Sequence, residues 1–357
     1  IGIENILDWS DPMRPVSRLL CVLLSLLLLL SLTACAHPLS SDDIAATRDR
    51  AMRSTVGFDY YIDTNGILRI DPKQTVNPEY AALDGASDIA AAVNVPCWYG
   101  TCFVRQDRTP VFPKTLEMQQ QAAKGDWMSQ FRIDARTDLI DAWNGKSIQY
   151  IGNSSTDLTV PWMLTSDGVL YANTEQIADS VAYVNGFAVI HCDGTVKYMP
   201  SANQWAAPEP SSDWKNIVQV ADLFQSGTLI GLTADGTLAQ DIYDADAYPR
   251  TPICDLSGTF TELLPDTGFG NTLFARRPNG TLKIVFAASE DVVPQFSEKT
   301  PYDQLISNVD TGFWLAVTPD GTVEYLPAAG ASESAIAADK ASCAWILSRT
   351  DVQRLHN

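Results

Sequence analysis

The chain has 357 residues, of which 46% are hydrophobic and 19% are charged, with 24 lysines and arginines against 43 aspartates and glutamates. The formal net charge is therefore −19 at pH 7. A surface this acidic repels nucleic acid phosphates, so we expect no nucleic acid partner.

The N-terminal part carries the pattern of an export signal. Residues 1–12 contain three acids and no base, so we interpret them as a non-native or untranslated leader before Met13. Arg14 and Arg18 then precede the apolar run 19–33. This run is shorter than the roughly 20 residues of an ordinary membrane span. It has the length of a signal-peptide core, and an uncleaved signal anchor is the alternative.

The apolar run ends in Leu32-Thr33-Ala34-Cys35, which resembles the lipobox of bacterial lipoproteins. The resemblance implies a signal peptide over residues 13–34 and a diacylglyceryl group on Cys35. That group would hold the protein to a lipid bilayer on the extracytoplasmic side of a bacterial membrane. Residues 35–56 are predicted to be a tether, with a short helix that begins at the polar run Ser40-Ser41-Asp42-Asp43.

From residue 63 onward, one turn phrase recurs between apolar runs. Asp-Gly or Asn-Gly in this setting predicts a β-hairpin with a type I′ turn, in which both central residues need a positive φ. From Gly66 to Gly321 there are 255 residues over six intervals, 42.5 on average, which is the length of one four-stranded propeller blade. The copies are Asn65-Gly66, Asp167-Gly168, Asp193-Gly194, Asp235-Gly236, Asn279-Gly280, Asp320-Gly321 and a degenerate Asp107-Arg108.

Besides the regular spacing of the turns, the stretch 214–238 has the residue pattern of a known repeat family. It contains a strand with Trp and Ile, a small residue, an apolar strand that ends in Leu-Thr, and then Asp-Gly-Thr. This order resembles the regulator-of-chromosome-condensation repeat, and the resemblance covers roughly residues 57–355. It implies an all-β fold, a seven-bladed β-propeller over 57–357, with eight blades as the alternative. The function of the founding member does not follow from the fold.

Two segments interrupt or end the repeats. The interval after the second copy is long, and Gln119–Lys124 followed by Gly125 predicts helix, so we expect a helical insertion over about 113–147. Such an insertion either lies on the binding face or is a solvated excursion. Segment 336–348 is predicted to be a strand region that completes one blade together with segment 58–63.

The sequence holds few signals of catalysis. The three histidines form no metal-binding pair, and no Ser or Cys lies in a nucleophile-elbow motif. We therefore predict no cofactor, no metal and no catalytic residue. Cys97 and Cys102 are either a disulfide or two buried thiols.

The aromatic residues of loops and insertion are the candidate binding residues, because aromatics supply much of the binding energy at interfaces. The function favoured by these features is a membrane-anchored binding module that recognises a protein, a peptide or an envelope glycan through a propeller face. The alternative is a propeller-type glycan hydrolase or lyase with carboxylates near the axis. The candidate binding residues are Trp98, Tyr99, Trp127, Trp143 and Trp205.

Overall fold

In the computed structural model the chain is mostly β-structure, with short helices and many small antiparallel sheets. The export signal, residues 35–53 of the predicted tether, and Cys97 lie outside the described residues, as do Trp98, Tyr99 and Trp205. The last predicted tether residues, 54–56, are part of the fold: Ser54 pairs with Ala92 in an antiparallel bridge, and Val56 is buried. The structure describes residues 54–95, 100–114, 116–154, 157–185, 188–192, 194–198, 214, 216–223, 227–242, 253–265, 272–288, 293–308 and 313–355.

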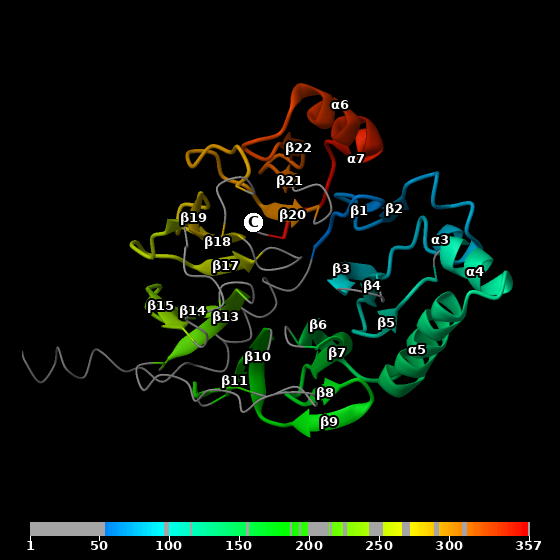
Figure 1. Ribbon diagram of the computed structural model, residues 1–357, viewed down its shortest axis with the longest axis horizontal. Coiled ribbons are helices and arrows are strands. Elements are labelled where there is room, and N and C mark those ends of the chain that lie inside the picture. Colours follow the sequence, from blue (N-terminus) through cyan, green and yellow to red (C-terminus); the bar gives the residue numbers. More distant parts are fainter. Residues whose placement is uncertain are drawn as a thin grey trace, which may run out of the picture.

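The described strands form seven sheets, each built from strands that are close in sequence. Figure 1 shows these sheets in chain order around the molecule. The sheets are β1 (Tyr60–Ile62) and β2 (Leu68–Ile70); β3 (Ile89–Val95), β4 (Gly100–Arg105) and β5 (Pro110–Val111); β6 (Ile148–Ser154), β7 (Asp157–Thr165), β8 (Leu170–Ala172) and β9 (Glu175–Ala178); β10 (Val181–Asn185), β11 (Ala188–His191) and β12 (Val196–Tyr198); β13 (Ile217–Leu223), β14 (Thr228–Thr233) and β15 (Leu238–Ile242); β16 (Ile253–Cys254), β17 (Glu262–Pro265), β18 (Thr272–Arg276) and β19 (Leu282–Ala287); and β20 (Gln304–Ser307), β21 (Trp314–Val317) and β22 (Val323–Leu326).

Five helices are present among the described residues. α4 (Leu116–Ala123) and α5 (Trp127–Trp143) lie inside the segment in which the sequence predicts an insertion. α3 (Pro78–Ala81) precedes β3. α6 (Glu333–Ser342) and α7 (Ala344–Leu347) occupy the segment predicted to be strand, so that prediction is wrong. The Ser332 side chain caps α6 by accepting from the Ala335 N–H at 3.2 Å, and this local capping favours helix.

The recurring turns close the hairpins, but their type differs from the prediction. At Asp235-Gly236, the Gly236 N–H donates to the Thr233 carbonyl and the Thr233 N–H donates to the Thr237 carbonyl. Among the described turn residues, none of the Asp or Asn residues before the glycine has a positive φ. The loop is therefore a three-residue type I turn with a bulge at the glycine, not a type I′ turn. Both hydrogen bonds recur in all seven copies, including the degenerate one, where Arg108 takes the glycine position at φ 72°.

Gly236 also contacts the next sheet, which yields a test of the turn. Its φ is +85°, and a Cβ there would lie 2.7 Å from the Phe260 carbonyl oxygen. Gly66 has φ +76° but open space around it. We expect Gly66→Ala to cost about 1 kcal/mol of unfolding free energy from backbone strain, and Gly236→Ala roughly 2–4 kcal/mol because it adds a backbone clash. Equal urea midpoints for the two variants would contradict this account.

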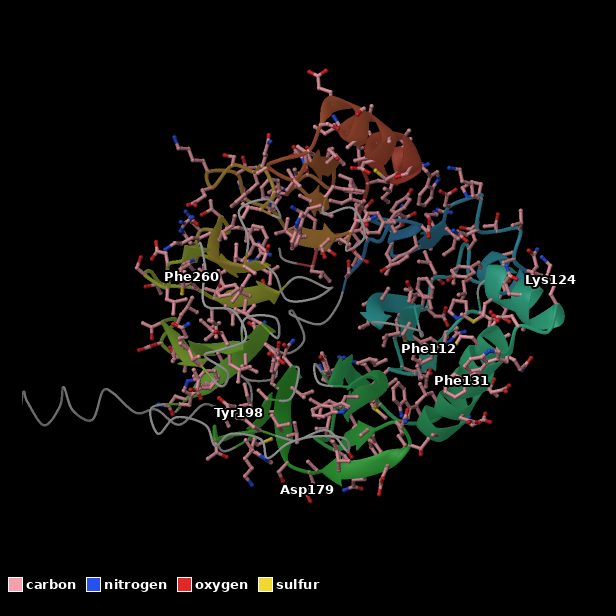
Figure 2. The ribbon with its side chains drawn as sticks, viewed as in Figure 1. Phe112, Lys124, Phe131, Asp179, Tyr198 and Phe260 are labelled. Atoms are coloured by element: carbon pink, nitrogen blue, oxygen red, sulfur yellow. The ribbon has the colours of Figure 1, made fainter. Side chains whose placement is uncertain are left out.

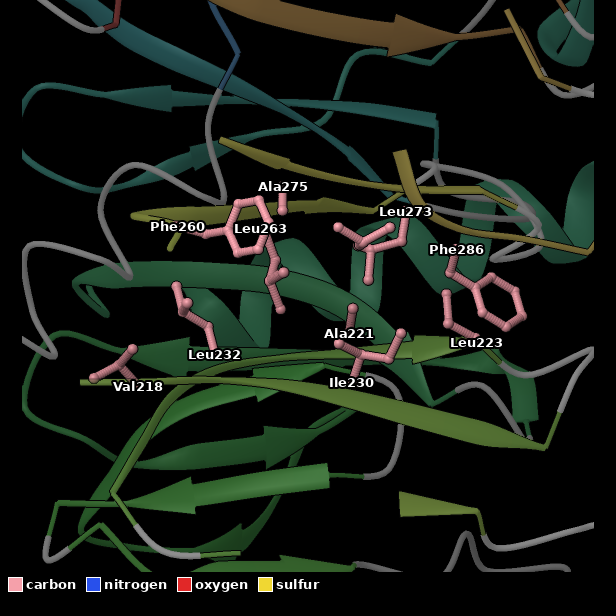
Figure 3. Packing of buried hydrophobic residues seen from close by; sticks show 11 residues of the cluster. Val218, Ala221, Leu223, Ile230, Leu232, Phe260, Leu263, Leu273, Ala275 and Phe286 are labelled. Carbon is pink, nitrogen blue, oxygen red and sulfur yellow. The ribbon is translucent and has the colours of Figure 1, made fainter. Parts of the chain in front are cut away.

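Among the described residues, seven clusters of buried side chains make up the core, and each lies between two sheets. One joins β1–β2 to β3–β4, the next joins β3–β5 to β6–β7, and further clusters follow in chain order up to β20–β22. The last joins β21 and β22 to β1. Figure 3 shows the cluster between β13–β14 and β17–β19, where Ile230 and Ala221 face Leu273. Each sheet therefore packs its faces against its two neighbours in chain order.

The two ends of the described chain meet beside β1. Asp63 pairs with Val352 in an antiparallel bridge, and the Gln353 N–H donates to the Ile62 carbonyl at 2.8 Å. The Thr64 N–H donates to the Asp351 carbonyl, also at 2.8 Å. Residues 351–353 make the backbone pairing with β1, while the segment 336–348 contributes side-chain packing, with the Trp345 ring 5.6 Å from the Tyr61 ring.

Candidate interaction surface

The helices α4 and α5 are fastened to the rest of the fold at several points. The backbone N–H of Lys114 donates to a Glu79 carboxylate oxygen at 2.7 Å, and the Gln119 amide donates to the other at 3.3 Å. The Asn77 amide donates to the Lys114 carbonyl at 2.5 Å. These bonds connect α3 to the start of α4. Figure 1 shows α4 and α5 at the periphery of the molecule, on the outer side of β5.

α5 has a capped start and a buried side. The Asp126 carboxylate accepts from the Ser129 backbone N–H at 3.0 Å and from its hydroxyl at 2.5 Å, which caps the helix. Leu139 and Trp143, one turn apart, are 2% and 0% exposed and lie in the cluster between β3–β5 and β6–β7. This side of α5 is part of the core.

Trp143 is therefore not an exposed binding residue, contrary to the sequence-based prediction. Its indole Nε1 donates to the Asn173 carbonyl at 2.7 Å, and its ring lies 6.0 Å from that of Phe112. Leu139 and Trp143 share one side of the helix through their i, i+4 spacing, but Trp127 and Phe131 have the same spacing, so this pattern alone does not identify the buried side.

The opposite side of α5 faces solvent. Trp127 is 71% exposed and Phe131 is 50% exposed, and the two are one helical turn apart. Figure 2 shows Phe131 on α5 at the edge of the molecule. Exposed residues continue along the same side as the aspartates Asp134, Asp138 and Asp141. We call this set, residues 127, 131, 134, 138 and 141, the α5 stripe. It brings one predicted binding residue, Trp127, together with Phe131, which sequence reasoning missed.

Cys102 is a free thiol in the same cluster as Trp143, with 0% exposure. It lies opposite Val93 in the β3–β4 pair, and burial raises the pKa of its thiol. Its partner in the predicted disulfide, Cys97, lies outside the described residues. The choice between a disulfide and two buried thiols therefore stays a prediction.

Several buried polar side chains join neighbouring sheets. The Gln219 amide on β13 donates to the Leu263 carbonyl at 2.7 Å and accepts from the Leu263 N–H at 2.8 Å on β17. Gln304 on β20 accepts from the Thr55 N–H at 2.8 Å, beside β1. Each amide thus satisfies backbone groups of the next sheet, as buried polar groups require.

The buried ion pair Glu262–Arg276 has the same role. Arg276 Nε lies 2.7 Å from Glu262 Oε2, and Nη2 donates to the Asp303 carbonyl at 2.8 Å. Nη1 donates to the Tyr302 carbonyl. The guanidinium therefore connects β17 and β18 to the start of β20. These are structural connections, and they engage the carboxylate of Glu262, which is 3% exposed.

The turn carboxylates are also engaged within their own turns. Three groups donate hydrogen bonds to the Asp235 carboxylate and so lower its pKa. The Thr233 hydroxyl has the largest effect, and the Thr237 N–H and hydroxyl contribute less. Thr318 and Thr322 do the same for Asp320. A small part of the acidity of the chain thus belongs to the repeat. Among the described residues, no three His, Cys, Asp or Glu side chains gather in a way that suits a metal ion.

The comparisons with known proteins give the chain no family. No protein-family model matches it, and no curated protein does. Among solved structures, the computationally designed protein Ika8 aligns at 16% identity with a TM-score of 0.29, over 46% of this chain and 54% of the designed one. A likeness at this level carries no argument about fold or function. No helix within the described residues has the length and apolar character needed to span a membrane.

Proposed function

We propose that the protein is a non-covalent binding module and that the α5 stripe is its binding surface. The observation that carries the proposal is the two-sided character of α5. One side is locked into the core by Leu139 and Trp143, while Trp127 and Phe131 are presented to solvent. Aromatic side chains on a rigid element are the usual anchors of protein recognition. The partner is a protein, a peptide or an envelope glycan.

This surface lies at the periphery and not over the centre, where a propeller face would bind. We propose that the scaffold is a closed seven-bladed β-propeller of divergent regulator-of-chromosome-condensation-type repeats. Support comes from the seven cores between consecutive sheets, the last of which joins β21 and β22 to β1. The seven identical turn hydrogen-bond patterns support the repeat. A stiff ring of this kind would hold α5 in a fixed orientation.

We propose an extracytoplasmic location, with the protein anchored to a bacterial membrane through lipid on Cys35. The support is the order of basic residues, apolar run and Leu32-Thr33-Ala34-Cys35. Anchoring would place the α5 stripe near other envelope components. It would also raise the effective concentration of a partner held at the same membrane.

The binding proposal is tested by removing the two aromatic anchors together. We expect Trp127→Ala/Phe131→Ala to weaken capture of envelope partners by roughly tenfold or more, since each anchor contributes on the order of 1–3 kcal/mol. Val76→Ala/Ile242→Ala is the matched control, because both residues are exposed apolar residues away from α5. Binding would be measured by pull-down from a native envelope extract followed by titration. Unchanged capture by the α5 variant would contradict the proposal.

A further inference from the structure

We infer that the α5 stripe recognises a cationic amphipathic segment of a partner protein. The inference rests on the proposed function and names the class of partner. The stripe has two chemically distinct parts. Its first two turns carry the aromatic residues Trp127 and Phe131, and its remaining turns carry the exposed carboxylates of Asp134, Asp138 and Asp141.

The spacing of the five stripe residues defines the kind of partner segment that can lie along α5. The intervals from 127 to 131, 134, 138 and 141 are 4, 3, 4 and 3 residues, which keeps all five positions on one side of a helix. Fourteen residues at 1.5 Å each span about 21 Å. A complementary segment would place one apolar turn against the aromatic part. Lysines or arginines at helical spacing over the next three turns would face the carboxylates.

Asp138 and Asp141 lie in the C-terminal half of α5, and Asp141 lies in its last turn, where the helix itself does not favour an anion. The C-terminal end of a helix carries a partial negative charge, which stabilises cations and disfavours anions. The last turn of α5 contains no basic residue. The stripe therefore keeps a negative field that a cationic partner would neutralise.

The same charges disfavour the other occupants of an exposed aromatic surface. A second copy of the chain docked stripe to stripe would bring six carboxylates together, and each chain already carries a net charge of −19. An anionic bilayer surface would repel the acidic half of α5. A neutral glycan would stack on the aromatic part and leave the carboxylates without a complement. A cationic protein segment uses both parts.

The test uses the full chain and a labelled amphipathic helical peptide built from leucine and lysine, with its leucine–glutamate counterpart for comparison. Binding is followed by fluorescence anisotropy at about 50 mM and 500 mM salt. We expect Asp134→Asn/Asp138→Asn/Asp141→Asn to weaken binding of the lysine peptide by roughly fivefold to tenfold at low salt. The difference should nearly vanish at high salt, because exposed ion pairs are screened. The glutamate peptide should not bind measurably.

The matched control removes the same number of charges elsewhere. Asp179, Asp320 and Glu333 are exposed acids away from α5. Asp179→Asn/Asp320→Asn/Glu333→Gln should change the affinity less than twofold. Equal weakening by the two triple variants would mean that the peptide senses net charge alone, which would overturn the inference. All variants should keep the thermal midpoint of the parent chain, which separates loss of binding from loss of folding.

The remaining outcomes separate this inference from the proposed function. If Trp127→Ala/Phe131→Ala weakens capture of envelope partners while the stripe carboxylates have no effect, the binding surface stands and the cationic partner does not. If neither change matters, both are wrong. Sedimentation with vesicles containing 30% phosphatidylglycerol, and the oligomeric state in solution, complete the test. Vesicle binding or dimer formation that depends on Trp127 would overturn the inference in favour of a bilayer or a second copy.

Discussion

Replacing Trp143 by alanine should destabilise the protein by about 3–5 kcal/mol, the usual cost of truncating a large buried aromatic side chain. The Trp143 ring is fully buried between the β3–β5 and β6–β7 sheets. Its loss would open a cavity beside Leu139 and Phe112 and leave the Asn173 carbonyl without its indole donor. The measurement is the urea midpoint followed by circular dichroism and intrinsic fluorescence.

Trp127, on the other side of the same helix, is the control. It is 71% exposed, so Trp127→Ala should change the unfolding free energy by no more than about 0.5 kcal/mol. Two tryptophans at opposite ends and on opposite sides of α5 thus separate a core role from a surface role. Similar losses in the two variants would mean that the buried side of α5 has been assigned incorrectly.

The repeat could be predicted from sequence because its chemistry is local. Gly at φ > 0, with an Asp, Asn or Thr that bonds within the turn, is determined by four or five residues. Even the degenerate copy at Asp107-Arg108 was found in this way, and Arg108 adopts the left-handed conformation at φ 72°. The turn type was wrong because the hairpin signal alone does not distinguish a two-residue loop from a three-residue loop with a bulge.

The C-terminal helices were missed for the opposite reason. The apolar runs 336–338 and 344–347 were interpreted as strands because they follow the last repeat. The helix signals were present: Ser332 as N-cap, Glu333 in the first turn, Lys340 in the last and an alanine-rich interior. Ile346 then packs in the cluster that joins β21 and β22 to β1.

The candidate site was predicted only in part, because exposure depends on tertiary packing. A sequence identifies aromatic residues in an insertion, but not which side of the helix meets the sheets. Trp127 and Trp143 lie 16 residues apart in one helix and differ from 71% to 0% in exposure. The polar connections between sheets, such as the one from Gln219 to Leu263, join residues 44 apart in sequence, so no local sequence pattern predicts them.

Arg276→Met should be the second large effect, with a loss of about 3–5 kcal/mol, the usual cost of removing one partner of a buried ion pair. The Arg276 and Glu262 side chains are 8% and 4% exposed, so the substitution leaves Glu262 without its ion-pair partner in the interior. It also removes the donors to the Tyr302 and Asp303 carbonyls, which connect two neighbouring sheets. We expect a lower urea midpoint and faster amide exchange at the start of β20.

Two further variants serve as controls for the Arg276→Met prediction. Arg277, the next residue, forms an exposed pair with Glu298 at 2.7 Å, and Arg277→Met should cost no more than about 1 kcal/mol because exposed pairs contribute little. The double variant Arg276→Met/Glu262→Leu removes both buried charges and should recover part of the loss, since replacing a whole buried pair by apolar side chains is often close to neutral. A double variant as unstable as Arg276→Met would show that the guanidinium bonds to Tyr302 and Asp303, and not the stranded carboxylate, dominate. No loss in Arg276→Met would contradict the assignment of this pair as a connection between sheets.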